Sequence, residues 1–373
     1  MGTMQHPSDS FAGAAHALPL ASPVPVPATP APLAQASEDA PVLVEAARGG
    51  LVESEHRGVA AVVDYRGWVV GQWGNIERLV FPRSAIAALQ AVPLVETGAL
   101  DAFQLGETEL ALACASHSGE LRHVRLARNW LNRIGLGPEA LGCGVCWPQD
   151  QDATFEMIRN GEAATAFHNP CSGKHLGLLT TALYCREPIQ SYLHPDHPLQ
   201  QRLRIVLETM AGIDLKAAPV GMASCQMPTL AMPLRAVALA MARLGQPEGL
   251  PPSHATALAR IRKAWGTHHP LISGHSTFDT RLMRAAPGAQ LLLKRGGEGL
   301  CCAILPRQRL GIAVKILDGS DVAATVAMAA LLRTCKIIPE ERWTDLADLT
   351  TPPRLSQGKR LVGALRPARG WLA

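Results

Sequence analysis

The stretch GVAAVVDYRGWVVGQWG, residues 58–74, carries the clearest structural signal in the chain. Two runs rich in Val, Ala and aromatic residues flank Arg66-Gly67, a dipeptide suited to a tight turn. Runs of this kind on either side of a turn predict a β-hairpin. One sheet of the protein is therefore expected to begin here.

Three more β-rich runs lie near the other end of the chain: AQLLLKRG, GLCCAILP and LGIAVKILDG. Glycines and charged residues separate them, which predicts an antiparallel meander, and an Ala-rich helix capped by Ser320 follows. The hairpin (about 50–75) and the meander (about 289–318) are expected to form one five-stranded antiparallel sheet flanked by helices. With a mainly helical subdomain over about 120–285, the fold class is α+β.

The two ends of the chain differ from this middle part. Residues 1–41 are rich in Ala, Pro and Ser, a composition that buries too little apolar surface to fold, so a disordered tail is expected. The folded domain is expected over residues 42–340, and residues 341–373 are expected to form a C-terminal tail.

Composition argues against several classes of partner. The chain has 35 Lys and Arg against 31 Asp and Glu, without a basic block, so nucleic acid is an unsuitable partner. No uncharged apolar run approaches the roughly 18 residues of a membrane span, so no membrane association is expected. Nine cysteines, an odd number without framework spacing, favour a cytoplasmic protein with reduced thiols.

Two serines could act as nucleophiles, and one lysine could act as their general base. Ser84 begins a predicted helix, whose backbone N–H groups could stabilise an oxyanion. Ser116 lies in the polar loop CASHSGE. Lys294 ends an apolar strand, where burial would lower its pKa toward that of a general base. Two alternatives stay open, namely Ser84 as a helix N-cap and Lys294 as a side chain that reaches solvent.

A further polar cluster is NPCSGKH, residues 169–175. Helical spacing would place Cys171, Lys174 and His175 on one face, and Cys with His is an acceptable zinc pair. Cys225 offers a second thiol from a distant loop. Two small buried thiols without a metal remain the alternative.

Taken together and in order, these motifs resemble the asparaginase II family of the Rhizobium etli type, over roughly residues 42–335. The motifs are RGGLVESEHRG from Arg48, FPRSA from Phe81, QAVPLVETGA from Gln90, CASHSGE from Cys114, HNPCSGKHLG from His168, DHPLQ from Asp196 and KRGGEG from Lys294. The resemblance implies a serine β-lactamase-like fold, usually as a homodimer. It also implies hydrolysis of the side-chain amide of L-asparagine to L-aspartate and ammonia.

The resemblance further implies roles for particular residues. Members use two Ser–Lys tandems, whose first serine falls on Ser84 and whose second pair falls on Ser116 and Lys294. Arg83 and His117 are expected to contact the substrate. Members also hold a zinc ion, and the matching ligands here are Cys171, Lys174 and Cys225.

Two positions depart from the family pattern. The first tandem reads S-x-x-K in the family, but Ala87 stands in place of the lysine. The second zinc cysteine follows D-G in the family, but here Ala223 replaces the aspartate. Because an activated serine without its base loses orders of magnitude in rate, we expect an amidohydrolase of weakened activity. The alternative is a non-catalytic homologue that binds an amino acid or amide.

Overall fold

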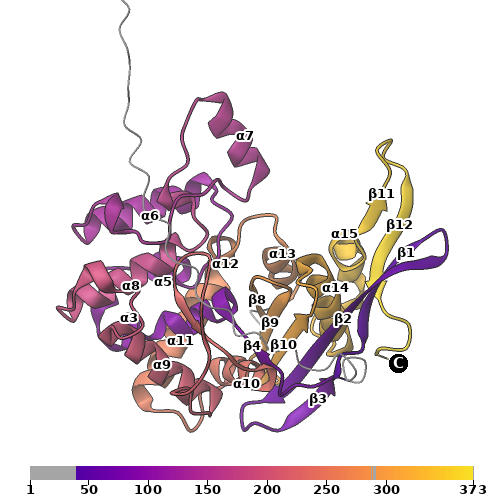
Figure 1. Cartoon of the computed structure of the whole chain (residues 1–373), viewed down its shortest axis with the longest axis horizontal. Helices are drawn as coiled ribbons and strands as arrows, with labels where there is room; N and C mark the ends of the chain where they lie inside the picture. The colour runs from indigo at the N-terminus through magenta and orange to yellow at the C-terminus, as the bar shows by residue number, and fades with distance from the viewer. Residues whose placement is uncertain (1–38, 287, 289–290, 373) are drawn as a thin grey trace, which may run out of the picture. The chain divides into compact units, whose positions relative to one another are not determined.

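The computed structural model describes residues 39–286, 288 and 291–372. The expected disordered tail therefore lies almost entirely outside the described residues. Within the described part, strands and helices build a mixed α/β fold around an antiparallel sheet (Figure 1). No helix there has both the length and the apolar character needed to cross a membrane.

The main sheet has eight strands rather than the expected five. Its order is β11-β12-β1-β2-β10-β9-β8, and β3 also pairs with β2. The strands are β1 (Val42–Arg48), β2 (Leu51–Asp64), β3 (Val69–Trp73), β8 (Leu292–Arg295), β9 (Leu300–Leu305), β10 (Leu310–Ile316), β11 (Pro353–Leu355) and β12 (Leu361–Pro367). The expected hairpin is β2–β3 and the expected meander is β8–β9–β10, so these five strands are present. The prediction is wrong in the number of strands, because the sheet has three more than expected.

The three additional strands come from the two ends of the folded region. The first half of β2 pairs with β1, and β1 in turn pairs with β12, where Ala46 lies opposite Leu365. Residues 341–373, expected to be a tail, thus include two strands of the sheet and the buried side chains of Trp343 and Leu365. The strand sequence LVGALRP lacks a clear alternation, and its partner β1 lies some 300 residues earlier in the chain.

Helices α10 (Leu234–Gly245) and α14 (Asp321–Thr334) pack on the strands β9 and β10. Gly311 of β10 makes the close approach of α10 possible, because a Cβ atom there would overlap the backbone of Ala238 and Ala242. Ser320 caps α14 as predicted, since its Oγ accepts a hydrogen bond from the Ala323 N–H at 3.2 Å.

The other helices are mostly gathered beside the sheet (Figure 1). They are η2 (Arg83–Ile86), α2 (Ala87–Gln90), α3 (Val92–Glu96), α4 (Ala99–Ala102), α5 (Glu107–Ala113), α6 (Leu121–Arg133), η3 (Pro138–Ala140), α7 (Gln151–Arg159), η4 (Ala166–His168), α8 (Ser172–Tyr184), η5 (Ile189–Ser191), α9 (Pro198–Ala211), α11 (Pro252–Thr267), α12 (His269–Ile272), α13 (Phe278–Ala285), η7 (Glu340–Leu346) and α15 (Ala347–Thr350). Four short strands form two small ladders, β4 (Leu79–Val80) with β7 (Met232–Pro233) and β5 (Val220–Met222) with β6 (Pro228–Leu230). The edge strand β8 contacts η2, α11 and α13, so polar residues of the helical part meet the sheet at this edge.

Candidate functional site

A cavity of about 490 Å³ lies where β8 meets the helical part. We call it the β8 cavity. Its wall includes residues from five segments that are far apart in the sequence, 83–84, 116, 143–146, 169–171 and 294–297. Three of the lining residues are Ser84, Ser116 and Lys294, so the structure brings the proposed nucleophiles and the proposed base to one place.

Ser84 lies on a tight turn into the helical part. The preceding residue, Arg83, has a φ of 48°, in the left-handed region that only a constrained turn imposes on such a residue. The N-cap of η2 is Pro82, without a side-chain capping bond, so the N-cap alternative for Ser84 is wrong. Neither the hydroxyl nor the backbone N–H of Ser84 has a hydrogen-bond partner among the described residues. Both groups are therefore available to a ligand in the β8 cavity.

Gly296 and Gly297 face this turn from the end of β8. A Cβ atom at Gly296 would lie 3.1 Å from the Cβ of Ala85, a tighter contact than most, so glycine favours the close approach of the two segments. The Gly296 N–H donates to the Leu300 carbonyl, whereas the Gly297 N–H has no such partner in the described part of the chain. Ser84 and Gly297, which both line the β8 cavity, thus each have an unpaired backbone N–H group. An oxyanion site needs such free N–H donors.

Lys294 is only 1% exposed, so the alternative of a side chain that reaches solvent is wrong. Its ammonium donates to the Arg295 carbonyl at 2.8 Å. Burial lowers the pKa of Lys294 to about 8, and the nearby carboxylate of Asp279 opposes part of that effect. A lysine with this pKa exchanges protons readily near neutral pH, as a general base must.

Asp279 is a site residue that sequence reasoning missed. It lies in the first turn of α13, is almost completely buried and lines the β8 cavity. Its Oδ1 accepts a hydrogen bond from Arg295 Nε at 2.9 Å, and this ion pair holds the residue next to Lys294. No spacing pattern in the sequence connects Asp279 with Lys294, because α13 and β8 meet only through the tertiary fold.

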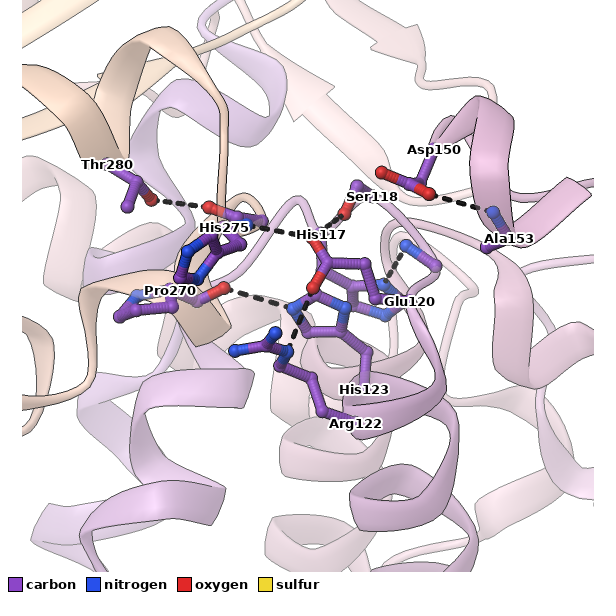
Figure 2. Close-up of polar contacts among 12 residues, drawn as sticks. His117, Ser118, Glu120, Arg122, His123, Asp150, Ala153, Pro270, His275 and Thr280 are labelled. Atoms are coloured by element: carbon purple, nitrogen blue, oxygen red, sulfur yellow. Dashed lines mark hydrogen bonds and ion pairs between the residues drawn. The ribbon is translucent and has the colours of Figure 1, made fainter.

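The loop that carries Ser116 is fixed from both sides. The Ser116 N–H donates to the Ile272 carbonyl at 2.9 Å, and the His117 N–H donates to the Pro170 carbonyl at 3.1 Å. Figure 2 shows a further contact, in which Glu120 Oε1 accepts from Ser118 Oγ at 3.0 Å and from the backbone of His275 at 2.8 Å. The Ser116 side chain is therefore presented to the cavity by a well-anchored loop.

His117, expected to contact the substrate, takes a different place. It is 0% exposed and is not part of the cavity wall. Its Nε2 lies 2.8 Å from Ser172 Oγ, its Nδ1 accepts from the Gly119 N–H, and its ring stacks on His123. Burial lowers the pKa of His117 well below its usual value, so the ring is neutral. His117 thus positions the Ser116 loop.

Arg83, the other expected substrate contact, does line the β8 cavity. Its guanidinium lies 3.4 Å from a carboxylate oxygen of Glu298 and 3.4 Å from Ser224 Oγ. A partly exposed guanidinium at a cavity wall is suited to bind a carboxylate.

Cys171, Lys174, His175 and Cys225 form a buried cluster beside the cavity. Cys171 precedes α8, and Asn169 Oδ1 accepts a hydrogen bond from its N–H. A hydrogen bond from the Cys171 thiol, with further donors on His175 and Lys174, holds the pKa of Cys225 far below its usual value. Burial lowers the pKa of Lys174, but its interactions with Cys171 and Cys225 outweigh burial, so the pKa is raised overall. The cluster therefore contains a thiolate and an ammonium in contact.

The donors that this cluster offers to a metal ion are the sulfur atoms of Cys171 and Cys225 and the amine of Lys174. His175 Nε2 is buried and has no hydrogen-bond partner among the described residues. The His175 ring nevertheless lies close enough to Cys225 for each group to shift the pKa of the other. No group of three or more His, Cys, Asp or Glu residues in the described part of the chain could hold a metal ion.

Comparison with known protein families gives a match over most of the chain. The family model described as L-asparaginase II matches residues 44–367. No curated protein sequence matches the chain.

Three crystal structures align weakly with the fold. They are a β-lactamase from Mycobacterium bovis (11% identity, TM-score 0.36, 79% of this chain and 95% of that one), a D-alanine carboxypeptidase from Burkholderia cenocepacia (14%, 0.39, 74% and 93%) and a class C β-lactamase from Rhodobacter sphaeroides (14%, 0.37, 75% and 94%). TM-scores below 0.5 do not establish a shared topology, so the family is assigned from the sequence match.

Proposed function

Because this chain belongs to the L-asparaginase II family, we propose that it is an amidohydrolase that converts L-asparagine to L-aspartate and ammonia. The observation that carries the proposal is the convergence of Ser84, Ser116 and Lys294 on one cavity, with Lys294 buried and its pKa lowered to about 8. At pH 7 about a tenth of such a lysine is neutral, which is enough for a general base.

In the proposed mechanism, Ser84 Oγ attacks the amide carbon and its proton passes to Lys294, directly or through the Ser116 hydroxyl. The backbone N–H groups of Ser84 and Gly297 stabilise the oxyanion. Lys294 then returns the proton to the amide nitrogen, the C–N bond breaks, and ammonia leaves an aspartyl ester on Ser84. Water, deprotonated by Lys294, hydrolyses the ester and restores the serine.

We also propose how the substrate is oriented. The guanidinium of Arg83 binds the α-carboxylate, and the Asp321 carboxylate in the same wall attracts the α-ammonium. The side-chain amide of the substrate is then directed toward Ser84. In this arrangement Lys294 serves both serines, which replaces the missing lysine at position 87.

Zinc is proposed as a structural ion at the Cys171–Lys174–Cys225 cluster. The metal would neutralise the two thiolates and tie α8 to the loop of Cys225. Lys174 would bind as a neutral amine, which the charge of the metal favours. No catalytic step depends on this ion, because the bond-making groups are Ser84, Ser116 and Lys294.

The test is ammonia release from L-asparagine by the purified protein. The Ser84→Ala variant should lose at least about a hundredfold in kcat. Ser253→Ala, an exposed serine on α11, is the matched control and should keep full activity. Full activity in Ser84→Ala would overturn the assignment of the nucleophile, and no release by the wild type would overturn the proposed function.

A second candidate is a non-catalytic protein that binds an amino acid or an amide in the β8 cavity. The observation that favours it is Ala87, which removes the lysine of the first tandem. In that case L-asparagine should raise the melting temperature of the wild type without ammonia release. Measurable turnover that depends on Ser84 would contradict this candidate.

A further inference from the structure

A second cavity, of about 310 Å³, lies between α2 and α9. We call it the α9 cavity. Its wall includes Ile86 and Gln90 from the η2–α2 segment, Gln200 and Leu203 from α9, and Thr229 from β6. It shares no lining residue with the β8 cavity. It is therefore a separate cavity, which the residues that follow Ser84 in the η2–α2 segment help to line.

Two glutamine side chains in this wall present carbonyl oxygens without a hydrogen-bond partner among the described residues, and the oxygen of Gln90 is also buried. Gln90 is 8% exposed, and its Oε1 has no hydrogen-bond partner among the described residues. Gln200 is equally buried, and its Nε2 donates to the Tyr192 carbonyl at 2.7 Å. Because Nε2 is held by that bond, the Gln200 carbonyl oxygen is free to accept a hydrogen bond from a ligand. A buried acceptor without a donor, as at Gln90, is costly, so a ligand with N–H groups would stabilise this wall.

The rest of the wall limits the ligand further. The aliphatic side chains of Leu203, Leu207 and Leu215 line the cavity, and so do three charged residues, Asp196, Arg204 and Lys216. A volume of about 310 Å³ suits a small molecule. An apolar body with one polar head that donates hydrogen bonds would match both parts of the wall.

We propose that the α9 cavity binds a small primary amide with an apolar body. Its amide N–H groups donate to the carbonyl oxygens of Gln90 and Gln200, and its body packs on the leucines of α9. This goes beyond the proposed hydrolysis, because the ligand binds where no nucleophile lies.

The α9 cavity has a direct structural link to the nucleophile turn. Thr229, in its wall, accepts a hydrogen bond on Oγ1 from the Arg83 N–H at 3.3 Å. Ile86, also in the wall, lies two residues after Ser84. An occupant therefore contacts the elements that hold Arg83 and Ser84, so its binding should change the KM for L-asparagine.

Calorimetric titration with benzamide tests the binding site. Wild-type protein should bind benzamide at least about tenfold more tightly than benzoate, which has the same ring and no N–H donors. Gln90→Met should weaken benzamide binding about tenfold, whereas Gln357→Met, at an exposed glutamine, should not change it. Benzoate bound as tightly as benzamide, or no binding of benzamide by the wild type, would overturn the proposal.

Two more variants locate the bound molecule independently of Gln90. Ala218→Phe introduces a large side chain from a partly exposed wall position and should block benzamide binding. Ser84→Ala should bind benzamide as the wild type does, whether or not the protein hydrolyses asparagine. Unchanged binding in Ala218→Phe, or lost binding in Ser84→Ala, would place benzamide elsewhere and overturn the proposal.

Discussion

At the scale of single residues, the chemistry depends on the protonation state of Lys294. Its pKa is lowered to about 8 because the side chain is buried, with Asp279 acting in the opposite direction. The neutral amine is the base, so kcat/KM should rise with pH and level off above that pKa. Lys294→Met should lower kcat by a factor of about 10² to 10⁴ and remove this limb of the profile. The exposed-site control Lys359→Met should leave both unchanged.

A flat pH profile between pH 6 and 9 in the wild type would contradict the role of Lys294. The same holds if Lys294→Met retains the rising limb, because another group would then titrate.

Ala87 is the residue that separates this chain from the family pattern. It is 0% exposed and is not part of the β8 cavity wall. A lysine at this position would place an ammonium among apolar neighbours, so Ala87→Lys should lower the melting temperature. Ammonia release should already be measurable without it. Release that occurs only in Ala87→Lys would show that Lys294 cannot replace the missing base.

At the scale of elements, the sheet and its covering helix are held together by a glycine. A Cβ atom on Gly311 would overlap the backbone of α10, so Gly311→Ala should force β10 and α10 apart. We expect a loss of about 1–3 kcal/mol in the free energy of unfolding, measured by urea denaturation. The control Gly358→Ala would add only an ordinary contact, 3.9 Å from Ser356 Oγ, and should change stability by less than about 0.5 kcal/mol. Equal effects of the two substitutions would contradict this packing.

The elements predicted correctly from the sequence are those with strong local signals. The turn at Arg66-Gly67 and the Ser320 cap are both present, because each depends on neighbouring residues alone. Strand β12 was missed because its stability comes from pairing with β1, a contact that no local pattern encodes.

In the candidate site, too, residues in local motifs were predicted, whereas a residue placed by distant contacts was not. Motifs identified Ser84, Ser116 and Lys294, which line one cavity, and the cysteine cluster beside it. They did not identify Asp279, whose role depends on α13 lying against β8. They also gave His117 a substrate contact, although the fold buries its ring against His123.

At the scale of the whole molecule, the proposed zinc ion would join distant parts of the helical region. The purified protein should contain about one zinc per chain by elemental analysis. Cys225→Ser should lose the metal and lower the melting temperature, because removing one thiolate leaves an incomplete ligand set. Cys335→Ser, outside the cluster, is the matched control. A metal content near zero in the wild type would contradict the zinc proposal without affecting the proposed chemistry.

The most direct test of the central claim, that Ser84 is the nucleophile of an amide hydrolysis, is to trap the covalent intermediate. The wild type is mixed with L-asparagine, quenched with acid and digested, and the peptides are measured by mass spectrometry. We predict an aspartyl ester on the peptide that contains Ser84, and its absence in Ser84→Ala. An ester on the Ser116 peptide instead, or ammonia release that persists in Ser84→Ala, would contradict the claim.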